Sequence, residues 1–122
     1  MVIETNFRTV APDICVVELN GRLVLGGSAQ GIDWKLESLV KDGARKIVVD
    51  VTRLTAIDSM GIGVLMMLIG RAQQNGGVVK IAGASGLVAT TFRIVRMDRV
   101  VDMYESLDAA CASFRNAAGA PA

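Results

Sequence analysis

Two apolar, mostly β-branched segments enclose one long helical segment, and this arrangement most constrains how the chain can fold. The segments are residues 46–51 and 78–82, and the helical pattern runs from about Ser59 to Asn75. Nearly continuous apolar strands are typical of strands covered on both faces, as in parallel sheets. The strand–helix–strand connection is expected to be right-handed. The centre of the chain therefore predicts a mostly parallel sheet covered by helices.

The N-terminal part of the chain predicts an antiparallel pair of strands. Residues 2–10 alternate between two sets of side chains, as an edge strand does, and Pro12-Asp13 predicts a turn. The two sets are Ile3, Thr5, Phe7 and Thr9 on one face and Glu4, Asn6 and Arg8 on the other. Residues 14–20 form a second strand that we expect to end at Gly21.

Three further helices and a short last strand complete the expected order. Their N-caps are predicted at Ser28, Ser85 and Ser106, and the strand over residues 100–104. Trp34 lies off the apolar stripe of the first helix, either packed at its margin or exposed to a partner. The fold class is α/β, a small mixed sheet flanked by helices in the order β-β-α-β-α-β-α-β-α. Residues 1–116 are expected to form a single domain and residues 117–122 a flexible tail.

Composition excludes several classes of function. Thirteen basic and twelve acidic residues give a net charge of +1, which argues against nucleic-acid binding. No apolar run approaches the about 20 residues of a membrane span, and the N-terminus does not resemble a signal peptide, so a cytoplasmic protein is expected.

Histidine is absent, which removes Ser-His-Asp and Cys-His catalysis and most zinc sites. Cys15 and Cys111 flank no metal-ligand pattern and are expected in the core. The sequence therefore predicts no metal site and no cofactor.

The residues Asp58-Ser59 place a hydroxyl and a carboxylate at the start of the central helix. A helix start offers unpaired backbone N–H groups and favours negative charge, including a phosphate. One interpretation is that Asp58 or Ser59 only caps the helix. The other is that Ser59 is a modified residue, with Gly61 and Gly63 leaving the first turn open to a partner or its nucleotide.

The central helix carries two apolar stripes. The first is expected to face the sheet and consists of Ile62, Leu65, Ile69 and Ala72. The second points elsewhere and consists of Met60, Val64, Met67 and Arg71. It is either a protein-binding face, suited to adaptable methionines, or the contact with a neighbouring helix.

Asp58-Ser59-Met60-Gly61-Ile62-Gly63 resembles the Asp-Ser-Ser-Gly-Leu-Gly motif of the STAS domain, the family named for sulfate transporters and anti-sigma-factor antagonists. Residues 47–51 with Leu54 are similar to the family's preceding strand and loop, and residues 76–81 to its next turn and strand. The resemblance implies a small mixed sheet flanked by helices and a non-enzymatic role.

In the bacterial antagonists, the serine at the position of Ser59 is phosphorylated by a partner that is both an anti-sigma factor and an ATP-dependent kinase. The resemblance implies that the unmodified protein binds this partner and releases a sigma factor for transcription. Phosphorylation ends the binding, and a protein phosphatase restores it. The expected partner-binding residues around Ser59 are Asp58, Met60, Gly61, Gly63, Val64, Met67, Arg71 and Arg22.

The chain departs from the family pattern at two places. Met60 replaces the second serine, and residues 21–24 read Gly-Arg-Leu-Val where antagonists commonly have Gly-Glu-Leu-Asp. Arg22 would suit a more acidic partner, or would pair with Asp58 or with a phosphate on Ser59.

Two other functions remain open at this stage. The first is a STAS scaffold without phosphorylation, in a stress-signalling, lipid-transport or anion-transport assembly. The second is a nucleotide-binding protein or enzyme, since Gly61-Ile62-Gly63 resembles a dinucleotide loop. Met66, however, stands where that motif needs its third glycine.

Overall fold

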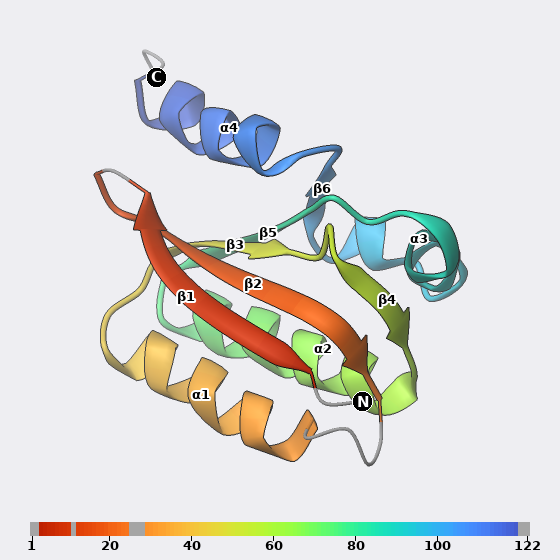
Figure 1. The fold of residues 1–122 in the computed structure, drawn as a ribbon. Coiled ribbons are helices and arrows are strands. Elements are labelled where there is room, and N and C mark those ends of the chain that lie inside the picture. The colour runs from red at the N-terminus through yellow and green to blue at the C-terminus, as the bar shows by residue number, and fades with distance from the viewer. Residues whose placement is uncertain (1–2, 11, 25–28, 120–122) are drawn as a thin grey trace.

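A six-stranded mixed sheet forms the centre of the molecule (Figure 1). The computed structural model describes residues 3–10, 12–24 and 29–119. The strand order is β1-β2-β3-β5-β6, and β4 pairs with the end of β2. The strands are β1 (Glu4–Val10), β2 (Ile14–Leu23), β3 (Lys46–Asp50), β4 (Leu54–Ile57), β5 (Val78–Ala82) and β6 (Asp102–Tyr104). Only β1 and β2 pair antiparallel among these described strands, so the expected mixed, mostly parallel sheet is confirmed.

Helices cover both faces of the sheet. They are α1 (Ala29–Lys41), α2 (Ser59–Gln74), α3 (Gly86–Ile94) and α4 (Leu107–Gly119), with a short 3-10 turn, η1 (Met97–Arg99). Figure 1 shows α1 and α2 side by side on one face, α4 on the opposite face, and α3 beside β4. The central strand–helix–strand unit therefore has the predicted arrangement.

Two apolar cores hold these layers together. The larger core lies between the sheet and α1, α2 and α3, and it includes Val17, Leu19, Leu36, Ile47, Val49, Leu65, Leu68, Ile81 and Phe92. The smaller core lies under α4 and includes Ile14, Val16, Val48, Ala82, Ala110, Cys111 and Phe114. The strands thus bury both faces, as their nearly continuous apolar sequences predict.

A buried lysine helps to hold α4 on the sheet. Lys80 of β5 donates a hydrogen bond to Oγ of Ser113 at 2.7 Å, and its Nζ lies 4.3 Å from the ring centroid of Phe114. A buried ammonium needs such partners because desolvation otherwise disfavours its charge. Tyr104 of β6 is a more distant partner, with its hydroxyl 3.4 Å from Nζ. The two shorter contacts come from α4, so the charge favours the docked position of this helix.

The structure corrects the prediction that the second strand ends at Gly21, and it contains a strand, β4, that the expected order of elements lacks. Gly21 has a φ of 101°, and β2 continues past it to Leu23. This extension pairs with β4, with a register shift between Gly21 and Arg22. Thr55 Oγ1 also donates to the carbonyl of Gly21 at 2.9 Å. The irregularity at Gly21 thus redirects β2 from β3 to a new partner.

The helix boundaries agree with the sequence at some ends and differ at others. The Oγ of Ser106 accepts a hydrogen bond from the N–H of Ala109 at 3.1 Å, as expected of an N-cap. Ser85 precedes α3 but makes no such bond, and Ser28 lies outside the described residues. Helix α4 continues to Gly119, so residues 117–119 are not the tail that was expected, because Ala117 and Ala118 favour helix. Residues 120–122 lie outside the described part of the chain.

Cys111 lies in the smaller core as expected, whereas Cys15 is only half-buried. Burial raises the pKa of both thiols, which keeps them protonated and unreactive near neutral pH. Within the described residues, no group of three or more acidic, cysteine or histidine side chains is placed to hold a metal ion. None of the helices in this part of the chain has the length and apolar character needed to span a membrane.

A matched pair of substitutions on α1 tests the packing. Leu36 is fully buried and Trp34, two residues away, is 73% exposed. We expect Leu36→Ala to lower the free energy of unfolding by about 2 to 5 kcal/mol, because it leaves a cavity in the larger core. Trp34→Ala should change it by less than about 0.5 kcal/mol. Urea unfolding of the two variants measures the difference, and similar losses would contradict this placement of α1.

Candidate functional site

Ser59 is the first residue of α2, and it is exposed. Strand β4 ends at Ile57, so Asp58 alone connects the sheet to the helix (Figure 1). Among the described residues, the hydroxyl of Ser59 has no hydrogen-bond partner. The site therefore presents an accessible oxygen at the positive end of a sixteen-residue helix.

Asp58 caps α2. Its backbone is extended, with φ −118° and ψ −171°, and its Oδ1 accepts a hydrogen bond from the N–H of Gly61 at 3.1 Å. Of the two capping candidates, Asp58 thus fills the role. Ser59 does not serve as the cap, and this leaves its hydroxyl accessible at the surface.

Gly61 allows α2 to begin directly against the end of β2. A Cβ atom here would overlap the carbonyl oxygen of Leu23 and come within 2.7 Å of Ile57 Cγ1. The N–H of Asp58 also approaches the same Leu23 carbonyl, at 3.4 Å. Gly61 is therefore buried inside the molecule, which corrects the expectation that it opens the first turn to a partner. Gly63, by contrast, is exposed with open space around it, as expected.

The second stripe of α2 is largely the contact with α1. Val64 is only 6% exposed and belongs to the larger core, so its predicted place on a partner-binding face is wrong. Arg71 forms an ion pair with Glu37 of α1, with Nη1 and Oε1 3.2 Å apart. The reason is that α1 lies beside α2 on the same face of the sheet, so that α2 is covered on two sides. Met67 is partly exposed at the boundary of this contact.

The residues that are exposed in the first turns of α2 have a different spacing from the second predicted stripe. Met60 is 38% exposed and Met66, which sequence analysis did not include, is 40% exposed. Ser59, Gly63 and Met66 lie at i, i+4 and i+7, a helical spacing that could have revealed this row. We call the four exposed residues Ser59, Met60, Gly63 and Met66 the Ser59 surface.

Arg22 lies at the same end of the molecule as the Ser59 surface. It is exposed on the extension of β2, opposite Ala56 of β4, and its neighbour Leu23 pairs with Ile57. The pairing of β2 with β4 therefore brings a residue far from Ser59 in sequence close to the start of α2.

Comparison with known proteins agrees with this arrangement. The sequence profile of the STAS domain matches residues 8–110. The chain belongs to the STAS domain family. Among curated proteins of this family, one from Thermotoga maritima, provisionally named an anti-sigma factor antagonist, is 20% identical over 87% of this chain and 94% of its own length.

Solved STAS structures share the fold of this chain. An anti-sigma factor antagonist from Mycobacterium paratuberculosis superposes with a TM-score of 0.83 at 18% identity, covering 93% of this chain and 94% of that one. The antagonist SpoIIAA in its unphosphorylated form has a TM-score of 0.72 at 20% identity, covering 96% and 100%. SpoIIAA has also been solved in its phosphorylated form. The STAS domain of a SulP transporter from Vibrio cholerae has a TM-score of 0.71 at 16% identity, covering 93% and 89%.

The two glycines at the start of α2 generate a matched test. Gly61→Ala should lower the free energy of unfolding by at least about 1 to 3 kcal/mol, because the new methyl group overlaps the backbone of Leu23. Gly63→Ala should raise it by up to about 1 kcal/mol, because alanine is the better helix former at an open position. Chemical denaturation of both variants measures these opposite signs. Equal effects would show that Gly61 does not make this contact.

Proposed function

We propose that this protein is an anti-sigma factor antagonist whose binding is switched by phosphorylation of Ser59. In its unmodified form it binds an anti-sigma factor that is also a serine kinase carrying ATP, and this binding frees a sigma factor. The kinase phosphorylates Ser59 and the complex separates, and a protein phosphatase regenerates the unmodified form. The partner supplies the catalytic groups, so this chain is a substrate and not an enzyme, and it acts in the cytoplasm.

The observation that carries the proposal is the exposed Ser59 hydroxyl at the start of a helix that Asp58 already caps. Phosphoryl transfer requires the serine oxygen to reach the γ-phosphorus of ATP in line with the leaving group. The new oxygen–phosphorus bond forms while the bond to ADP breaks, and the hydroxyl proton passes to a base of the kinase. Open space around Gly63 leaves room for the nucleotide and the kinase backbone.

The charge of the phosphate explains how one modification would end the binding. Phosphoserine carries about −1.5 to −2 charges at pH 7. The N-terminus of α2 stabilises this charge within the protein, so the fold need not change. In the complex, however, the phosphate would be desolvated beside Asp58 and the partner's own nucleotide phosphates, where like charges repel.

The Ser59 surface has the properties of a docking site for a protein. Met60 and Met66 are each about two-fifths exposed, and methionine adapts its shape to varied partners. Arg22 adds an exposed positive charge at the same end of the molecule. We expect the partner to place acidic groups opposite Arg22, where antagonists with the usual glutamate would face basic ones. Met67 would lie at the edge of this contact, while the buried Val64 and Gly61 and the paired Arg71 would support it from below.

The binding of three Ser59 variants tests the proposal. Wild type and Ser59→Ala should bind the anti-sigma factor encoded nearest to this protein, measured by titration calorimetry with ATP present. Ser59→Asp should bind at least about 100-fold more weakly, a loss of about 3 kcal/mol, because a charge enters the centre of the contact. Ser85→Asp is the matched control, since Ser85 is also exposed at a helix start.

Mass spectrometry after incubation with the same partner and ATP gives the second readout. Phosphate should be found on Ser59 and not on Ser85, and the Ser59→Ala protein should stay unmodified. Equal binding by all three Ser59 variants, without phosphate transfer, would instead favour a STAS scaffold that does not use phosphorylation, a function compatible with the fold shared with the transporter domain.

A further inference from the structure

Strand β1 is a regular edge strand. It is the first in the strand order, and all seven of its residues pair with β2 without a register shift. Natural proteins usually protect such edges with charged side chains, above all lysine, or with proline, a bulge or a very short strand. The two charges of β1, Glu4 and Arg8, have opposite signs and so would repel an unrelated strand less than a row of like charges. Residues 4–10 contain no lysine, proline or bulge. The outer backbone groups of β1 therefore form a template for another strand.

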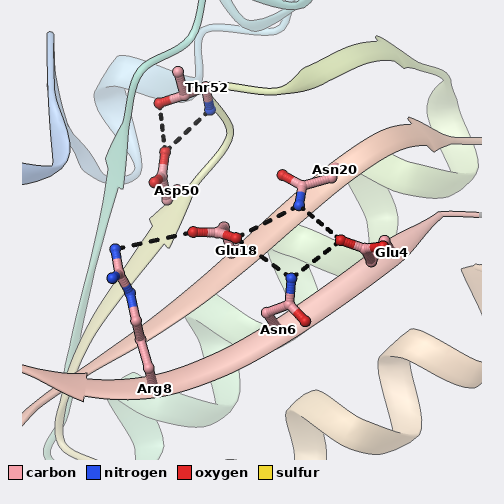
Figure 2. A network of polar contacts seen from close by, with 7 residues as sticks. All are labelled: Glu4, Asn6, Arg8, Glu18, Asn20, Asp50 and Thr52. Atoms are coloured by element: carbon pink, nitrogen blue, oxygen red, sulfur yellow. Dashed lines mark hydrogen bonds and ion pairs between the residues drawn. The ribbon is translucent and has the colours of Figure 1, made fainter.

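One face of β1 is complementary to itself. Glu4, Asn6 and Arg8 project from the same side of the strand, as Figure 2 shows. If a second copy of β1 pairs antiparallel with Asn6 opposite Asn6, each Glu4 lies opposite an Arg8 of the other copy. Opposite residues in such a pair have Cβ atoms about 4.5 to 5.5 Å apart, close enough for ion pairing.

The contacts within one copy leave these charges available. Arg8 approaches Glu18 of β2 only at 3.9 Å, and its side chain is 55% exposed. Glu4 accepts hydrogen bonds from the amides of Asn6 and Asn20 at 3.2 and 3.3 Å, both through Oε1 (Figure 2). Each residue can therefore gain a cross-strand partner without losing a short contact.

The other face of β1 is complementary in the same register. Phe7 is 43% exposed and lies opposite Val17, a member of the larger core, so its ring is on the side of α1 and α2. Antiparallel pairing about Asn6 places Phe7 opposite Thr5 of the second copy. The two Phe7 rings then become diagonal neighbours, about 7 to 8 Å apart and within reach of each other. Both faces thus favour one register.

We propose that the partner of the β1 edge is a second copy of this chain, paired antiparallel about Asn6, so that one sheet continues across two molecules. Such an interface is isologous, because the same strand serves both copies. Figure 1 shows β1 and β4 on opposite sides of β2, so the pairing leaves both Ser59 surfaces exposed. The dimer is therefore independent of the function proposed for Ser59.

Charge reversal tests the dimer by sedimentation equilibrium. Wild type should show a concentration-dependent dimer, and Glu4→Arg or Arg8→Glu alone should each weaken it by about tenfold or more. The first variant carries two arginines on this face and the second carries two glutamates. An equimolar mixture of the two variants should therefore associate again, because opposite charges meet at both positions. Asp102→Arg, on β6 at the other edge of the sheet, should leave the wild-type dimer unchanged.

Cysteine cross-linking provides a second measurement that does not depend on the charged variants. Asn6→Cys should form an intermolecular disulfide under mild oxidation, because residue 6 lies opposite itself at a Cα distance of about 4.5 to 5.5 Å. Thr9→Cys is exposed on the same strand, but its two copies would lie about 20 Å apart and should not cross-link. Wild type that stays monomeric at about 1 mM would overturn the proposal. So would an unchanged dimer in the charge variants, or equal cross-linking at residues 6 and 9.

Discussion

The contact between Gly61 and the carbonyl of Leu23 is the constraint on which the rest of the site depends. It lets the first turn of α2 lie directly against the end of β2, where any side chain would overlap the backbone. With the helix start fixed there, Asp58 can cap it from the end of β4, and Ser59 faces outward. An exposed hydroxyl at a helix N-terminus is thus the product of one close backbone approach and one cap. Only glycine lets the helix backbone come this close to the Leu23 carbonyl, because every other residue carries a Cβ atom there.

The packing of α1 against α2 decides which residues of α2 remain exposed at the surface. The first stripe of α2 faces the sheet, Val64 is buried in the larger core that α1 also lines, and Glu37 of α1 forms an ion pair with Arg71. The exposed residues of α2 are then Ser59, Met60, Gly63 and Met66 in its first turns and Arg71, Gln73 and Gln74 in its last turn. A modification of Ser59 lies within reach of any protein that binds the start of α2. Burial against the sheet and α1 therefore leaves the Ser59 hydroxyl within the exposed part of the first turns of α2.

The sequence predicted those features that arise from local or periodic signals. The strand–helix–strand centre, the start of α2 and the capping capacity of Asp58 all follow from patterns within a few turns of chain. Strand β4 was missed because four residues are too few for a pattern, and its partner exists only because β2 continues past Gly21. The burial of Val64 and Gly61 was missed for a related reason. Each depends on a distant element, α1 or Leu23, whose position periodicity alone does not specify.

The distribution of charge explains why the Ser59 surface can change state without disturbing the sheet. The N-terminus of α2 already favours an anion, so a phosphate there would add little strain to the isolated protein. The buried ammonium of Lys80 lies on the other face, enclosed by Ser113 and Phe114 of α4. Strand β1 lies across β2 from β4 (Figure 1). In the function proposed above, a new charge at Ser59 would therefore change the affinity of a bound partner more than the stability of the fold.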